Sequence, residues 1–175
     1  MKNSESKRLL VVVDMQEDFV RGSLATAEAQ AIVPAMIQKV REHKGPLAYT
    51  LDTHGPDYLS TSEGEHLPVV HCVKGEPGHA LIEELEGVLA GAEIFEKPTF
   101  GSVALAKRIA EDKSLSEVEL VGVCTDICVV SNALMIKAMR PEMRVLVDPT
   151  CCAGSTVERH LASLETMKSC QIEGI

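Results

Sequence analysis

Cys128 stands where a valine-rich segment gives way to a helical pattern, in the sequence GVCTDICVVSNA. A cysteine in the first turn of a helix has its thiolate favoured by the positive end of the helix dipole. Backbone N–H groups in such a turn are free to bind a developing oxyanion. The position therefore favours a nucleophilic cysteine, and the competing interpretation is a thiol packed in the core.

Two ionisable residues follow other apolar segments in the same way. Asp14 ends the run VVVD, where partial burial should raise its pKa and suit it to accept and return a proton. Lys97, in FEKPTFGS, is kept out of helical geometry by Pro98. Its charge could hold Asp14 ionised and lower the pKa of the Cys128 thiol. The alternatives are a capping role for Asp14 and a surface position for Lys97.

The stretch 52–79 is irregular and contains four histidines and several carboxylates. A long irregular segment in a compact domain is usually functional or disordered, and the histidines favour function. Asp52 and His54 directly follow an apolar run and alternate along an extended chain, so both side chains can face one ion. Carboxylate and imidazole ligands suit zinc, manganese or iron. The alternative is a polar loop with unrelated histidines.

The elements that must position these residues alternate between strand and helix patterns. Short apolar runs predict strands at 9–13, 47–51, 93–95, 118–123 and 144–147. Helical patterns cover 25–43, 80–89, 100–111, 126–139 and 156–168. Pro34 marks a first helical turn, and Ser155 is the expected N-cap of the last helix. The alternation predicts a parallel sheet between two helical layers, with the candidate residues beyond its carboxyl edge.

Length and composition limit the classes of protein. The 175 residues suit one domain spanning 1–175, and 45% hydrophobic content predicts a packed, mostly aliphatic core, since Trp is absent. A net charge of −9 argues against nucleic acid and anionic membranes as partners. No apolar run is long enough to span a bilayer, and the start lacks a secretory pattern, so a cytoplasmic protein with reduced cysteines is expected.

Six different motifs follow one another along nearly the whole chain: VVVDMQEDF, YTLDTH, LPVVHCVKGEPG, EKPTFGS, GVCTDICV and DPTCCAG. Together they resemble the isochorismatase-like family of cysteine hydrolases, and within it the nicotinamidase-like branch. The resemblance implies an α/β fold, with a three-layer α-β-α arrangement around a mainly parallel, Rossmann-like sheet. It also implies that Asp14, Lys97 and Cys128 form a catalytic triad.

A divalent metal site is implied by the same resemblance. Asp52, His54 and His71 match the family's ligands, and the fourth ligand is a His in some members and a Glu in others. Glu63 best fits the Glu version, with Glu65 and His66 as alternatives. Zinc is the expected ion, and manganese or iron are the alternatives.

The resemblance further implies an oxyanion hole and a substrate pocket. A cis peptide between Val123 and Cys124 directs the Cys124 N–H toward the substrate oxygen, and the Cys128 N–H completes the hole. Phe19 matches an aromatic residue that lines the pocket. The family commonly forms homo-oligomers, so the same is expected here.

The expected activity is hydrolysis of a small carboxamide through a thioester intermediate. Nicotinamide is the leading candidate for the substrate. Nicotinamidases usually carry a Trp just before the metal-binding His, where this chain has Leu67 and Pro68, and the loss of ring stacking puts the substrate in question. The alternatives are a carbamoyl or ureido amide and a non-catalytic scaffold that binds a metal or ligand. Cys128 argues against the vinyl-ether chemistry of the isochorismatases proper, which lack this nucleophile.

Overall fold

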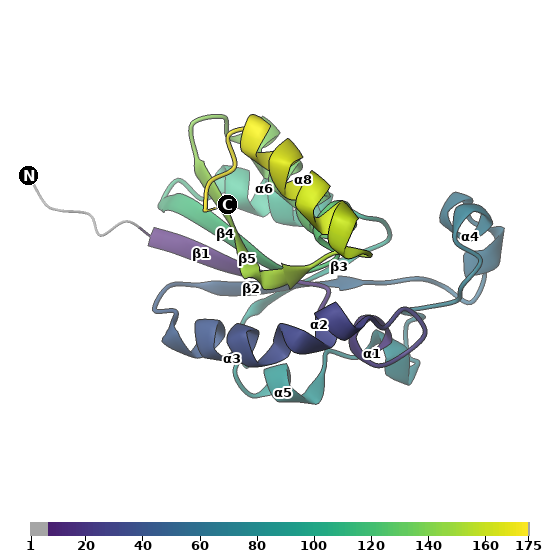
Figure 1. The fold of residues 1–175 in the computed structure, drawn as a ribbon. Coiled ribbons are helices and arrows are strands. Elements are labelled where there is room, and N and C mark those ends of the chain that lie inside the picture. Colours follow the sequence, from purple (N-terminus) through teal and green to yellow (C-terminus); the bar gives the residue numbers. More distant parts are fainter. Residues whose placement is uncertain (1–6, 175) are drawn as a thin grey trace, which may run out of the picture.

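The computed structural model describes residues 7–174, and its centre is a five-stranded parallel sheet in the order β3-β2-β1-β4-β5 (Figure 1). Side chains of β1 alternate between two buried faces, with Val11 and Val13 on one and Leu10 and Val12 on the other. This burial on both sides explains why residues 9–13 of the strand form an uninterrupted apolar run. The strands are β1 (Lys7–Val13), β2 (Leu47–Asp52), β3 (Glu93–Lys97), β4 (Leu115–Val123) and β5 (Arg144–Ala153).

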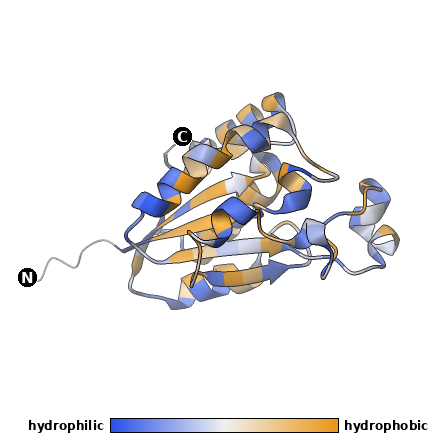
Figure 2. Cartoon of the chain, turned by 90° about the horizontal axis from the view of Figure 1, so that it is seen from below, coloured by the Kyte–Doolittle hydropathy of each residue, from blue (hydrophilic) through white to orange (hydrophobic). Residues whose placement is uncertain are grey.

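Helices cover both faces of the sheet and complete the predicted three-layer α/β fold (Figure 1). Figure 2 shows apolar residues along the central strands and polar residues on outward parts of the helices. One face carries α6 (Val103–Glu111), α7 (Val130–Met139) and α8 (Val157–Ser169). The other carries α1 (Glu17–Val20), α2 (Ala27–Ala31), α3 (Val33–Glu42) and α5 (Glu83–Glu86).

The segment between β2 and β3 projects beyond the carboxyl edge of the sheet, where α4 (Ser62–His66) stands apart from the layers (Figure 1). It also contains two 3₁₀ turns, Tyr58–Ser60 and Pro77–His79. At the same edge, Gly122 has a φ of 122°, and a Cβ there would lie 2.1 Å from the Val13 carbonyl oxygen. Only glycine therefore lets β1 and β4 approach so closely just before Asp14 and Cys124.

Several predicted boundaries differ from the structure. The helix expected over 25–43 is two helices, α2 and α3, with Pro34 in the first turn of α3. The helix expected over 80–89 shortens to α5, and the one expected over 126–139 begins as a π-helical turn, Thr125–Val129, before α7. The last strand extends past Asp148 because Cys152 and Ala153 pair again with β4 beyond an irregularity in register.

The N-cap prediction for the last helix was wrong. Thr156 caps α8, since its hydroxyl accepts the Arg159 N–H at 3.2 Å. Ser155 instead donates its backbone N–H and its hydroxyl to the Asp126 carboxylate, at 2.8 and 2.6 Å. The two hydroxyl residues are adjacent, so sequence alone could not separate their roles.

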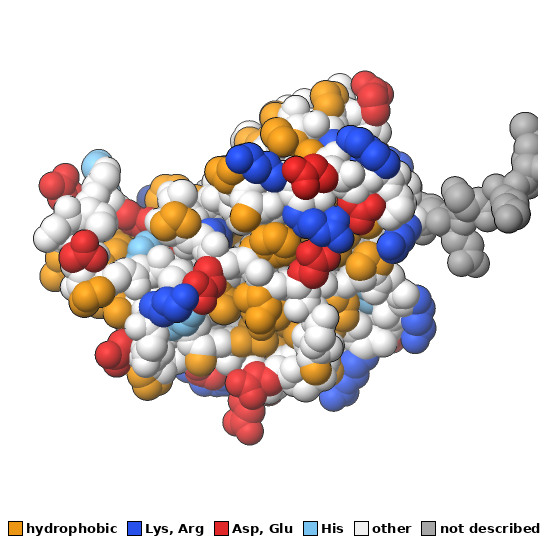
Figure 3. All heavy atoms as spheres, turned by 180° about the vertical axis from the view of Figure 1, so that it is seen from behind, with side chains coloured by type: hydrophobic (Ala, Val, Ile, Leu, Met, Phe, Trp, Pro, Cys, Tyr) orange, Lys and Arg blue, Asp and Glu red, His pale blue; other side chains and the backbone are white. Residues whose placement is uncertain are grey.

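Among residues 7–174, the structure contains no helix with the length and apolar content needed to cross a bilayer. On the face seen in Figure 3, Lys and Arg side chains lie interspersed with Asp and Glu. The cytoplasmic location, the single domain, the absence of nucleic-acid and membrane partners, and the homo-oligomer stay predictions.

Candidate active site

Asp14, Lys97 and Cys128 meet at the carboxyl edge of the sheet, and we call them the thiol centre. The Lys97 Nζ atom lies 2.7 Å from Asp14 Oδ2 and 3.4 Å from Cys128 Sγ. Lys97 is 1% exposed, so the alternative of a surface lysine is wrong. Asp14 directly follows β1, Lys97 is the last residue of β3, and Cys128 lies in the π-helical turn after β4. This convergence is expected for parallel strands that end at one edge of a sheet.

The Asp14 backbone has a φ of 51°, in the left-handed region that non-glycine residues seldom adopt. Thr50 holds this conformation, because its carbonyl and hydroxyl both accept the Asp14 N–H at 3.2 Å. The Thr50 hydroxyl also donates to Asp14 Oδ1 at 2.6 Å. One carboxylate oxygen is thus fixed by Thr50 and the other faces Lys97. Backbone outliers of this kind concentrate at functional sites.

Burial and the facing charges oppose one another in the thiol centre, and burial prevails at Asp14 and Cys128 but not at Lys97. Burial raises the pKa of Asp14 against the opposing charge of Lys97, as expected from the sequence. Burial opposes the charge of Lys97, but the carboxylates of Asp14 and Asp52 more than offset this and its pKa is raised. For Cys128, burial and the charge of Asp14 raise the pKa well above its usual value, although Lys97 lowers it. Lys97 thus acts on the thiol in the expected direction, but burial outweighs it, so the pKa of Cys128 is raised rather than lowered.

The turn around Cys128 is anchored on both sides. The Cys124 carbonyl accepts the N–H groups of Ile127 at 3.0 Å and Val129 at 3.1 Å. Asn132 donates its amide to the Cys128 carbonyl at 2.8 Å and accepts the Ser102 N–H at 2.9 Å. The Val123–Cys124 peptide is cis, as the resemblance implied.

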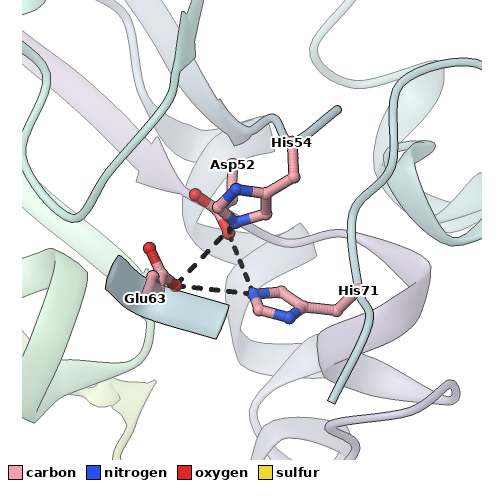
Figure 4. Close-up of side chains that lie close together, drawn as sticks. All are labelled: Asp52, His54, Glu63 and His71. Carbon is pink, nitrogen blue, oxygen red and sulfur yellow. Dashed lines mark hydrogen bonds and ion pairs between the residues drawn. The ribbon is translucent and has the colours of Figure 1, made fainter. Parts of the chain in front are cut away.

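A second group of side chains lies beside the thiol centre, and we call it the ligand cluster: Asp52, His54, Glu63 and His71. Their ligand atoms all lie within 4.8 Å of one another (Figure 4). Asp52 Oδ2 is 2.9 Å from His54 Nε2 and 3.3 Å from His71 Nε2. Glu63 Oε1 is 3.8 Å and 3.7 Å from the same two nitrogens.

The chemistry of the ligand cluster fits a divalent cation. Two imidazoles and two carboxylates form a donor set typical of zinc, manganese or iron sites. Burial alone would raise the pKa of Asp52, yet hydrogen bonds from His54 and His71 hold it below its usual value. Burial and the nearby Asp52 charge raise the pKa of Glu63. A cation between the two carboxylates would relieve this repulsion.

Surrounding groups fix the orientation of the four side chains. His71 Nδ1 is hydrogen-bonded to the Val69 carbonyl at 2.8 Å, which leaves Nε2 directed at the cluster. The Tyr58 ring packs against His54 and His71 with centroid distances of 4.7 and 4.9 Å. Gln16 accepts the Asp52 N–H at 2.7 Å and donates to the Asp52 carbonyl at 2.9 Å.

The two alternative fourth ligands lie away from the cluster. Glu65 and His66 are exposed on α4, and His66 Nδ1 is hydrogen-bonded to the Ser62 carbonyl at 2.7 Å. Glu63 is therefore the carboxylate that the fold brings to Asp52, because it lies on the inward side of the first turn of α4.

A cavity of about 420 Å³ opens onto both groups. Cys128 and Cys124 line it on one side, and Glu63 and His71 line it on another. Phe19, predicted to line a pocket, does so, and its ring packs edge-on against His71 at 5.7 Å. Leu67, at the place where a Trp was expected in nicotinamidases, is also in the wall.

Sequence reasoning missed the residues that support these groups. Gln16, Thr50 and Asn132 are almost fully buried and bond to Asp52, Asp14 and Cys128 respectively. Polar residues inside strongly apolar segments were the available signal. Arg159 also lines the cavity, and nothing in its local sequence indicated this.

Residues 8–173 match the isochorismatase domain. The chain belongs to the isochorismatase family. It is 28% identical to the nicotinamidase/pyrazinamidase of Mycobacterium tuberculosis, over 95% of this chain and 97% of that protein. The crystal structure of the Pyrococcus horikoshii pyrazinamidase in complex with zinc is similar, at 29% identity and a TM-score of 0.77 over 95% of this chain and 97% of that one.

The N-carbamoylsarcosine amidase of Thermoplasma acidophilum is another similar structure, with 27% identity and a TM-score of 0.76 over 93% of each chain. These similarities confirm the predicted fold, the predicted family and its nicotinamidase-like branch. The chain is thus a hydrolase of this branch, as predicted.

Proposed function

We propose that this chain is a cysteine amidohydrolase that converts nicotinamide to nicotinate and ammonia. The observation that carries the proposal is the buried Lys97 ammonium, in contact with both the Asp14 carboxylate and the sulfur of Cys128, which lines the cavity. The similarity to the nicotinamidase/pyrazinamidase of Mycobacterium tuberculosis supports nicotinamide as the substrate.

In the first half of the reaction, Asp14 accepts the Cys128 proton and the sulfur attacks the carboxamide carbon. Burial raises the pKa of Asp14, which makes its carboxylate a stronger proton acceptor. The backbone N–H groups of Cys124 and Cys128 stabilise the oxyanion of the tetrahedral intermediate. Asp14 then protonates the departing nitrogen, which leaves as ammonia, and a thioester to Cys128 remains.

In the second half, water attacks the thioester, Asp14 accepts its proton, and the carboxylic acid leaves as Cys128 regains its proton. Lys97 stabilises Asp14 while it is ionised and stays protonated throughout, as its raised pKa favours. Asp52, His54, Glu63 and His71 would hold a divalent ion, which supplies a Lewis acid when bound. Zinc is the proposed ion, supported by the donor set and by the zinc complex of the Pyrococcus horikoshii pyrazinamidase.

The test is ammonia release from nicotinamide by the wild-type enzyme and by Cys128→Ala. We expect the variant to lose turnover by at least about 10⁴-fold, because the nucleophile is gone, while its thermal unfolding stays close to wild type. Metal content by mass spectrometry checks that the ligand cluster is unaltered. Ammonia release by Cys128→Ala at the wild-type rate would contradict the proposal.

A second candidate is hydrolysis of a carbamoyl or ureido amide. Leu67 in the cavity wall favours it, because a leucine does not offer a pyridine ring the stacking of an aromatic side chain. The similarity to the Thermoplasma acidophilum N-carbamoylsarcosine amidase also supports it. A kcat/KM for nicotinamide far below about 10⁴ M⁻¹s⁻¹, with a higher value for an N-carbamoyl compound, would favour this candidate.

A further inference from the structure

We propose that Arg159 makes this enzyme selective for amides that carry a second, anionic group. The inference rests on the proposed amidase function and goes beyond nicotinamide, which carries no anionic group: an amide that also bears a carboxylate is the preferred substrate. Arg159 lines the same 420 Å³ cavity as the Cys128 thiol, so one ligand can reach both. Arg159 is held at this place by the first turn of α8, where the Thr156 hydroxyl accepts its backbone N–H.

The Arg159 charge is left available by its surroundings. Four arginines form ion pairs with carboxylates within the described chain: Arg8, Arg21, Arg108 and Arg144. Over residues 7–174, Arg159 has no such partner, and its Nη1 donates only to the Ser155 hydroxyl at 3.4 Å. A guanidinium that lines a cavity and has no carboxylate partner suits an anionic ligand.

The acidic groups near Arg159 are already engaged. Both oxygens of Asp126 accept hydrogen bonds from Ser155, at 2.8 and 2.6 Å. Asp52 and Glu63, which also line the cavity, face the histidines of the ligand cluster. A carboxylate on the substrate would therefore meet the Arg159 guanidinium without displacing an internal ion pair.

The cavity has room for such a substrate. A volume of about 420 Å³ is within the range that ordinarily accepts ligands larger than a single-ring amide. Between the polar ends the wall is apolar, with Leu24, Phe100 and Ile127. The fitting ligand has a carboxamide at the thiol, a flat or aliphatic spacer, and a carboxylate at Arg159.

The experiment compares two amides of the same shape, the diamide of pyridine-3,5-dicarboxylic acid and its monoamide, which carries one carboxylate. Initial rates of ammonia release give the ratio of kcat/KM for the anionic over the neutral amide. In Arg159→Gln we expect this ratio to fall about fivefold, the effect of one exposed ion pair, and to fall through KM. Arg41→Gln is the matched control, since Arg41 is exposed on α3 and lies outside the cavity lining, and it should leave the ratio unchanged.

Salt and direct binding complete the test. Raising the ionic strength should lower the ratio in the wild type and not in Arg159→Gln, because exposed charges are screened. Calorimetric titration of the monoamide into Cys128→Ala, with and without Arg159→Gln, measures binding without turnover. An unchanged dissociation constant would overturn the role of Arg159, whereas absence of ammonia from every amide with the constant still shifted would overturn the amidase function alone.

Discussion

The thiol centre and the ligand cluster share one edge of the sheet but are built differently. The thiol centre rests on the ends of strands, and each of its three side chains is at most 5% exposed. The ligand cluster takes Asp52 from β2 and its other members from the irregular segment before β3, and Glu63 is only partly buried. The first is a buried arrangement of ionisable groups at the ends of strands, whereas the second depends on a segment that projects beyond the sheet.

Lys97 is where the two groups touch. Its Nζ lies 2.7 Å from Asp14 Oδ2 and 3.2 Å from Asp52 Oδ1. One ammonium therefore contacts a carboxylate in each group. The ligand cluster, with two carboxylates, keeps an excess of negative charge that a divalent ion can balance. From this difference we expect the proposed proton chemistry to depend on the sheet and the proposed metal affinity to depend on the projecting segment.

The largest expected effect that separates the two groups comes from Asp14→Asn. Removal of the proton acceptor should lower kcat/KM by about 10²–10⁴-fold, while the metal content stays unchanged. The charge of Asp14 raises the pKa of Cys128, so the variant should also react faster with iodoacetamide at neutral pH. A more reactive thiol in a less active enzyme would identify Asp14 as the base, and full activity would contradict this role.

The pH dependence of alkylation tests the effect of burial on the pKa of Cys128. Because the pKa of Cys128 is raised, its thiolate fraction is small at pH 7 and should increase about tenfold per pH unit. The alkylation rate should therefore still rise through pH 9, where an ordinary cysteine approaches its plateau. Mass spectrometry of the Cys128 peptide measures the rate, with exposed Cys170 as the internal reference. A plateau near pH 7 would show that Lys97 outweighs burial.

Glu63→Gln tests whether the projecting segment controls metal affinity. Loss of one ligand should weaken zinc binding by at least about tenfold in a competition titration with a chelator. Glu65→Gln is the matched control, because Glu65 is exposed on the same short helix, and it should leave the affinity unchanged. Equal losses in both variants would contradict the assignment of Glu63, and a changed Cys128 alkylation rate would show that the two groups are not separable.

The two groups also differ in how far sequence could predict them. The residues of the thiol centre lie at or just beyond the ends of predicted strands, and parallel topology brings such strand ends together, so Asp14, Lys97 and Cys128 could be grouped before the structure was known. The state of the thiol could not be predicted in this way. A helix dipole is a local feature, whereas the burial that raises the pKa of Cys128 arises from packing among distant segments.

In the ligand cluster, the resemblance gave Asp52, His54 and His71 as ligands and preferred Glu63 as the fourth, with Glu65 and His66 as alternatives. Which of them faces inward depends on the direction in which α4 leaves the loop, and this is decided by tertiary contacts. The supporting bonds were invisible for the same reason, since Gln16 and Asp52 are 36 residues apart. The residues with a proposed chemical role were thus predicted more completely than the buried residues that hold them in place.

Substitutions of Tyr58 are expected to have the smallest effects of those considered. The ring and the hydroxyl of Tyr58 contact different parts of the segment, so two variants can separate their contributions. The hydroxyl donates to the Leu67 carbonyl at 2.9 Å, while the ring packs against His54 and His71. Tyr58→Phe keeps the ring, so we expect the free energy of unfolding to fall by about 1 kcal/mol with zinc affinity retained. Tyr58→Leu removes the ring as well and should weaken zinc binding. Denaturant unfolding and chelator titration measure the two quantities, and weaker zinc binding in Tyr58→Phe would mean that the path of the segment, rather than the packing of the histidine rings, determines the affinity.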